Sequence, residues 1–254
     1  MRFLTHFSDV TDPRTHINVK HDFLDVIFLT VSAVLSGAEG WHDIEVFGKD
    51  KLSWLKQYRA FENGIPVDDT IARIIRVICP KQLNQAFLNW VNEVRVETGK
   101  PQIAIDGKTL RQSYDGDKHT ALHSITAWSK DAGLVLAQLK SSRKKNEQVS
   151  VLEMPTSIKC RAIILSLLIA PNNPRLFAHW VLDVTFKEDG CRIRKDDGAE
   201  NVGVIRRFYL NMVRLNPKKG SMRSKLKMAG WGDDFRAELI FGYKMCGCPD
   251  VNMR

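Results

Sequence analysis

The sequence has few of the features that mark secreted and membrane proteins. It contains only five cysteines, an odd number at irregular spacing, so it indicates no disulfide framework and fits a reducing compartment. The longest apolar-rich run, residues 162–170, is far too short to span a membrane. The first residues lack the apolar core and the small-residue cleavage site of a signal peptide. We therefore expect a cytoplasmic protein without membrane contact.

Common nucleotide and zinc motifs are also missing. The chain has no GxxxxGK[ST] phosphate loop and no dinucleotide-binding fingerprint. Cys246 and Cys248 form half of a metal knuckle, but no second pair and no nearby histidine completes it. The sequence therefore indicates neither a nucleotide-dependent enzyme of these types nor a structural zinc protein.

Positive charge is in surplus. The 38 lysines and arginines exceed the 29 acids, which gives a formal charge of +9 and favours a polyanionic partner such as nucleic acid. Excess surface lysine in a soluble protein explains the same surplus equally well. Residues 217–227 concentrate the charge, with five cations and no acid: Lys218, Lys219, Arg223, Lys225 and Lys227.

Hydrophobic periodicity divides the chain into a helical first part and a mixed second part. Apolar spacing predicts helices over 23–35, from about 69 to 78 and over 83–94, the first capped by Asp22 and stopped by Gly37. Strands are predicted at 102–106, 121–129, 134–140 and 162–170, with a short helix at 147–154 before the last and a longer helix at 199–215 after it. This order opens an RNase H-like fold, although many other α/β domains begin in the same way. The six tryptophans are better explained as core or partly buried residues than as a base-stacking surface.

Asp106 is the residue with the clearest chemical potential. It follows the apolar run Ile103-Ala104-Ile105 and precedes Gly107, and a carboxylate at a strand end is suited to a hard cation such as Mg²⁺. An Asp-Gly turn that closes a hairpin is the alternative interpretation. Lys108 and Arg111 would suit an anionic substrate. Farther along, Arg192, Arg194 and Lys195 either bind the DNA backbone or belong to an ion-paired loop.

Several separate motifs together give the chain a family resemblance. They include Ser36-Gly37-Ala38-Glu39-Gly40-Trp41, Asn63-Gly64-Ile65-Pro66, Ile103-Ala104-Ile105-Asp106-Gly107-Lys108 and His179-Trp180-Val181-Leu182-Asp183. With these motifs the chain resembles bacterial insertion-sequence transposases of the H-repeat-associated group, a DDE-type family, over residues 1–155 and 179–241. The resemblance implies an RNase H-like core, Mg²⁺ or Mn²⁺, DNA of insertion-sequence ends as substrate, and Asp106 as the first catalytic aspartate. It also implies localisation at the bacterial nucleoid and leaves a homo-oligomer open.

The chain departs from that family in its middle. The predicted fourth strand carries no second aspartate, and Arg175 stands about where the third acid, a glutamate, is expected. The departures indicate an internal deletion around residues 155–178 and a transposase that is catalytically defective, because two of the three metal-binding carboxylates are missing. Three other acids could replace them: Asp183, Glu188 or Glu147.

The resulting expectation is a mixed α/β chain with an N-terminal helical region followed by an incomplete RNase H-like catalytic core. We expect a transposase-associated helical domain at 1–98, a DDE domain at 99–215 that is incomplete around 155–178, and a basic C-terminal tail at 216–254. Lys218 and Lys219 of the tail are expected to contact DNA. The alternative function is a non-catalytic DNA-binding remnant that interferes with an intact transposase, and a general RNase H-like nuclease is a weaker third.

Overall fold

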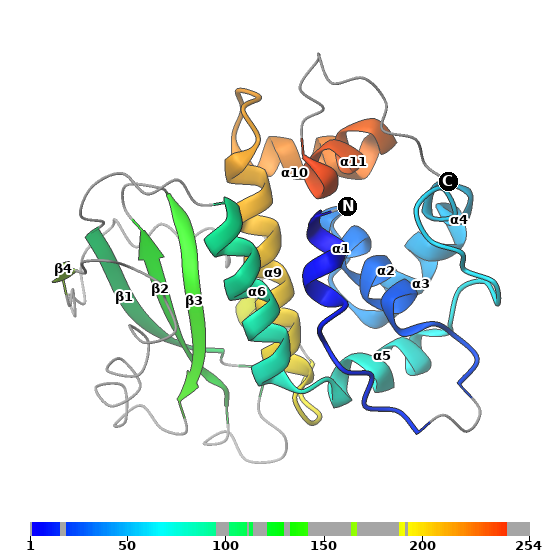
Figure 1. The fold of residues 1–254 in the computed structure, drawn as a ribbon, viewed down its shortest axis with the longest axis horizontal. Coiled ribbons are helices and arrows are strands. Elements are labelled where there is room, and N and C mark those ends of the chain that lie inside the picture. The colour runs from blue at the N-terminus through cyan, green and yellow to red at the C-terminus, as the bar shows by residue number, and fades with distance from the viewer. Residues whose placement is uncertain are drawn as a thin grey trace.

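Helices dominate the structure, and a small sheet lies at one side of them (Figure 1). The computed structural model describes residues 2–15, 19–94, 102–110, 112–113, 121–129, 133–141, 164–166, 188–190 and 193–242. Within these residues no helix has the length and apolar character needed to cross a membrane. The expectation of a mixed α and β chain is confirmed at this level.

The N-terminal part is helical, as predicted. Its helices are α1 (Arg2–Phe7), α2 (Phe23–Leu35), α3 (Trp41–Asp50), α4 (Leu52–Leu55), α5 (Asp68–Val77) and α6 (Pro80–Val94). The side chain of Asp22 accepts a hydrogen bond from the N–H of Asp25 and caps α2. Gly37 follows α2 with a φ of +99°, a conformation that glycine adopts without a steric penalty. Both predicted signals for the limits of this helix are therefore confirmed.

The described sheet has four strands. They are β1 (Gln102–Thr109), β2 (His123–Ser129), β3 (Leu134–Ser141) and β4 (Ile164–Ser166), in the spatial order β3-β2-β1-β4. β2 is antiparallel to both of its neighbours, whereas β1 and β4 are parallel. Hairpin connections followed by one parallel crossover are the pattern that the sequence predicts for these strands. The helix predicted at 147–154 lies outside the described residues.

Strand β1 does not end at Asp106, so the predicted strand end is wrong. Its pairing with β2 continues without a break through Asp106 opposite Thr126 and Gly107 opposite Ile125, as far as Thr109. The alternative, an Asp-Gly hairpin turn, is wrong for the same reason. Glycine is a weak strand former, but the ladder of β2 holds Gly107 in extended conformation.

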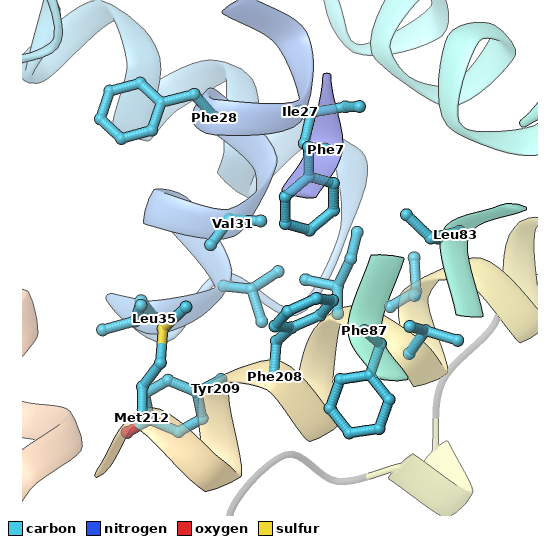
Figure 2. Packing of buried hydrophobic residues seen from close by; sticks show 14 of the residues in the cluster. Phe7, Ile27, Phe28, Val31, Leu35, Leu83, Phe87, Phe208, Tyr209 and Met212 are labelled. Atoms are coloured by element: carbon cyan, nitrogen blue, oxygen red, sulfur yellow. The ribbon is translucent and has the colours of Figure 1, made fainter. Parts of the chain in front are cut away.

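Helix α9 (Gly198–Leu215) lies at the centre of the molecule and confirms the helix predicted at 199–215. Figure 1 places α9 and α6 between the sheet and the other N-terminal helices. Figure 2 shows Phe208 of α9 among side chains from the N-terminal region. Its ring centroid is 4.9 Å from that of Phe7 and 4.8 Å from that of Phe87. The N-terminal helices and the sheet are therefore joined through one hydrophobic core.

Two further helices, α10 (Met222–Trp231) and α11 (Asp233–Phe241), pack near the N-terminal region. Arg236 of α11 is fully buried, with its guanidinium carbon 4.6 Å from the Trp54 ring centroid and its Nε donating to Ser36 Oγ at 2.8 Å. A buried guanidinium stacked on an aromatic ring fixes one helix against another. Residues far apart in the sequence are thereby held together.

Candidate functional site

A buried polar layer separates strand β2 from helix α9. Arg207 of α9 is fully buried, and its Nη2 donates to Thr126 Oγ1 at 3.2 Å and to Ser124 Oγ at 3.3 Å. Its Nη1 lies 3.1 Å from Oε1 of Glu188, which belongs to the short helix η3 (Glu188–Gly190). Both side chains of this ion pair have an exposed fraction of 1% or less. Burying an unpaired charge is costly, so Glu188 and Arg207 must stay paired for this polar layer to form.

The absence of a side chain at Gly203 allows this close approach. A Cβ added there would lie 3.2 Å from Gln138 Nε2 and 3.3 Å from Arg207 Nη1, tighter than ordinary contact. Gln138 of β3 is the register partner of Thr126. Gly203 thus lets α9 lie directly on the polar side chains of two strands.

Position 106 belongs to the same face of the sheet as this layer. In an antiparallel pair, residues directly opposite each other share a face. Asp106 is opposite Thr126, and Lys108 is opposite Ser124, whose side chains both bond to Arg207. The register therefore places both positions on the α9 side of β1, while the side chains of Asp106 and Lys108 lie outside the described part of the structure.

The structure describes only some of the acids that could replace the missing carboxylates. Glu188 is paired with Arg207, and both side chains are buried from solvent. Glu147 and Asp183 lie outside the described residues. Glu200, at the start of α9, lies 3.4 Å from Lys140, and burial raises the pKa of this carboxyl despite the nearby lysine.

The described residues contain one group of three side chains with metal-ligand chemistry, and it lies in the helical region. The donor atoms of His42, Glu45 and Asp68 are within 4.8 Å of one another. Glu45 Oε2 accepts from the N–H of Asp68 at 2.8 Å, and its Oε1 accepts from Lys49, which lowers the pKa of Glu45. These bonds explain Glu45 as an anchor for the N-terminus of α5. The side chain of Asp106 lies outside the described part of the structure, so the Mg²⁺ or Mn²⁺ site expected there stays a prediction.

The predicted DNA-binding residues lie at two places. Arg194 is half-buried, donates from Nε to the carbonyl of Gln112 at 2.9 Å and lines a cavity of about 320 Å³, with Lys195 exposed beside it. Lys218 and Lys219 are exposed between α9 and α10. The two groups belong to opposite ends of α9, so the structure does not bring them together. Arg111 and Arg192 lie outside the described residues.

Helix α10 contains residues 222–227 of the basic stretch 217–227 and continues to Trp231. Lys225 is buried, and its Nζ donates to the carbonyls of Val213 and Asn216, so this cation stabilises the C-terminal end of α9. Trp231, at the end of α10, has an exposed fraction of 77%. The expectation that all tryptophans are core or partly buried is therefore wrong for Trp231, because the helix that carries it turns this position away from the core.

Comparison with known proteins gives a consistent picture. Residues 4–91 match the family model described as DDE_Tnp_1-associated. The H repeat-associated putative transposase YhhI of Escherichia coli K12 is 43% identical over 166 residues, which are 65% of this chain and 44% of YhhI. The H repeat-associated putative transposase YbfD of the same strain is 42% identical over 165 residues, 65% of either chain. The inactive transposase YbfQ of that strain is 53% identical over 74 residues, 29% of this chain and 88% of YbfQ.

The chain thus spans less than two thirds of YhhI and of YbfD. No solved structure matches it.

Proposed function

The chain belongs to the family of H repeat-associated transposases, and from this membership we propose that it is a DNA-binding derivative of a DDE-class transposase with an incomplete metal centre. An intact DDE centre needs several carboxylates to hold two divalent cations, which activate the attacking oxygen and stabilise the leaving oxygen. Asp106 keeps the place of the first catalytic aspartate by resemblance. The DNA of insertion-sequence ends is the proposed partner, which puts the protein at the nucleoid.

The ion pair of Glu188 and Arg207 is the observation that carries the proposed defect. It occupies the layer under the face of the sheet to which position 106 belongs. The carboxylate of Glu188 is already neutralised by the guanidinium of Arg207, so binding a divalent cation would add little stabilisation. If Glu188 left this ion pair to bind a metal ion, Arg207 would remain as a buried unpaired charge. Glu188 is therefore a poor candidate for a second metal ligand, and we derive no cleavage step through metal ions.

The order and directions of the described strands support an RNase H-like ancestry of the sheet. We place an internal deletion around residues 155–178, which removes the second and third metal carboxylates. The division into a helical domain at 1–98, an incomplete catalytic domain at 99–215 and a basic region at 216–254 is part of the same proposal.

A nicking assay tests the catalytic part. Supercoiled DNA that carries terminal repeats is incubated with the full chain and Mg²⁺ or Mn²⁺, beside Asp106→Ala and an EDTA control. We expect no cleavage above the background of Asp106→Ala. Metal-dependent cleavage by the wild-type chain that disappears in Asp106→Ala would contradict the proposed defect.

A gel-shift titration tests the DNA-binding part. Phosphate contacts release counterions, so binding at roughly 50 mM salt should weaken steeply at roughly 200 mM. Binding without cleavage supports the proposal and makes interference with an intact transposase a practical experiment. Absence of binding at the lower salt concentration would contradict it.

A further inference from the structure

We propose that the exposed face of helix α10 binds unpaired nucleotides of a DNA strand, with Trp231 stacking on a base and Arg223 and Lys227 contacting the adjoining phosphates. This inference rests on the proposed function, because it presupposes that the chain binds DNA. It adds a binding site and a preference for single-stranded over paired DNA.

The spacing of three residues puts the required groups on one side of the helix. Arg223, Lys227 and Trp231 follow each other at intervals of four, and each interval turns about 40° around the helix axis. The three side chains therefore fall within about 80° of one another, and all three are exposed. Leu226 and Ala229 occupy the buried side of the same helix.

Trp231 is unusual among the apolar side chains of the described chain. Its exposed fraction is 77%, whereas the next most exposed large hydrophobic residue of the described chain, Val67, is at 54%. An indole exposed to water does not gain the stabilisation that tryptophan obtains by burying its large apolar surface. A tryptophan at the end of a basic helix face is suited to a partner that offers both anionic groups and flat rings.

Further cations adjoin this face. Lys218 Nζ lies 5.1 Å from the ring centroid of Phe235, which is in the first turn of α11, only four residues beyond Trp231. Lys219 is exposed next to it. The nearest acids in sequence are Asp233, which is bound by Arg236 at 2.7 Å and Lys51 at 3.5 Å, and the exposed Asp234.

Single-stranded DNA matches this combination better than a duplex does. A duplex offers phosphates to the cations but keeps its base faces stacked inside, where an indole cannot reach them. An unpaired base exposes its face, and stacking on an aromatic side chain stabilises the complex without regard to base identity. The cations supply the salt-dependent part of the affinity on either form.

Fluorescence anisotropy with two labelled probes tests the proposal on the full chain. One probe is a blunt duplex, and the other is the same duplex with a short single-stranded extension. We expect wild type to prefer the extended probe, and Trp231→Ala to weaken its binding by about 5- to 150-fold while leaving the blunt probe unchanged. Trp231→Phe should retain most of the preference, and Arg223→Ala with Lys227→Ala should weaken both probes together.

The controls separate stacking from misfolding and from general loss of charge. Trp231 is exposed, so Trp231→Ala should unfold at the wild-type temperature. Lys81→Ala removes an exposed cation from the start of α6, far from α10 in Figure 1, and should leave the preference unchanged. Quenching of tryptophan emission by the single strand should occur in wild type and be lost in Trp231→Phe.

Equal affinity of wild type for the two probes would overturn the inference, and so would equal losses of affinity on both probes in Trp231→Ala. A third contradicting result is a sedimentation coefficient of Trp231→Ala that differs from wild type without DNA, because it would make this face a protein contact. Failure of wild type to bind any DNA at low salt would instead overturn the proposed function itself.

Discussion

The side-chain amide of Asn211 forms two hydrogen bonds with the backbone of Val135. Asn211 Oδ1 accepts from the Val135 N–H and Nδ2 donates to the Val135 carbonyl, both at 2.8 Å. Asn211 is fully buried in α9, and Val135 lies in β3, beside the register shift between Ala127 and Trp128. The amide thereby takes the place of a neighbouring strand where the regular ladder is interrupted.

Replacing Asn211 by alanine should strongly destabilise the fold. Two buried backbone groups of β3 would lose their partners, at a cost of about 1–3 kcal/mol each. Urea denaturation followed by circular dichroism measures the change in the free energy of unfolding. Asn89→Ala, on the exposed side of α6, is the matched control and should change it by less than about 0.5 kcal/mol. Equal behaviour of the two variants would show that the contact with Val135 contributes nothing.

Arg207→Met should cost about 3–5 kcal/mol of unfolding free energy, because it leaves the carboxylate of Glu188 buried without its guanidinium. The double variant Arg207→Met with Glu188→Gln should recover part of that loss, since the stranded charge is removed. Chemical denaturation of the two single variants and the double variant gives the coupling energy of the pair. Additive losses would mean that Glu188 and Arg207 do not act as a buried pair.

Glu45→Gln should lower the thermal stability at neutral pH. Hydrogen bonds from Lys49 Nζ, first, and from the N–H of Asp68 hold the pKa of Glu45 below its ordinary value. A carboxyl with a lowered folded-state pKa contributes stability above its unfolded pKa of about 4.3, and this contribution is lost as the pH falls through the folded-state value. The difference in melting temperature between wild type and Glu45→Gln should therefore be present at neutral pH and vanish in acid. Glu62→Gln, at an exposed turn position, should show no such pH dependence.

Lys218→Ala with Lys219→Ala should weaken DNA binding without changing the preference for single strands. Each phosphate contact contributes about 0.9 to the slope of log K against log salt concentration, so losing two contacts should reduce the slope by up to about 1.8. Gel-shift titrations at several salt concentrations measure this slope. An unchanged slope would remove both lysines from the DNA contact.

The helices α2, α5, α6 and α9 were predictable because their signals are local. Asp22, Gly37 and the apolar positions of α2 act within one or two turns of the chain, and the structure has the helix at the predicted residues. The strands β2 and β3 were found for the same reason. The end of β1 was misplaced, since the Asp106-Gly107 pair is typical of turns when read alone and becomes strand only through its ladder with β2.

The candidate site was only partly predictable. Asp106, Lys218 and Lys219 stay predictions from the sequence. No local pattern distinguishes Lys225, which is buried, from Lys227, which is exposed. Trp231 was expected to be core or partly buried, because tryptophan is highly buried on average. Its exposure depends on how α10 packs against α11, α9 and α2.

The sequence by itself determined the family, the helices α2, α5, α6 and α9 and the surplus of positive charge, since composition, motif order and the 3.6-residue period are properties of the chain alone. Only the tertiary structure decided that Arg207 neutralises Glu188 beneath the sheet and that Trp231 faces solvent. The physical reason is distance along the chain: Arg207 is 19 residues from Glu188 and 81 from Thr126. The partner of a buried charge is set by tertiary packing. Packing brings together segments that are far apart in the sequence, and no local sequence pattern indicates which segments will meet.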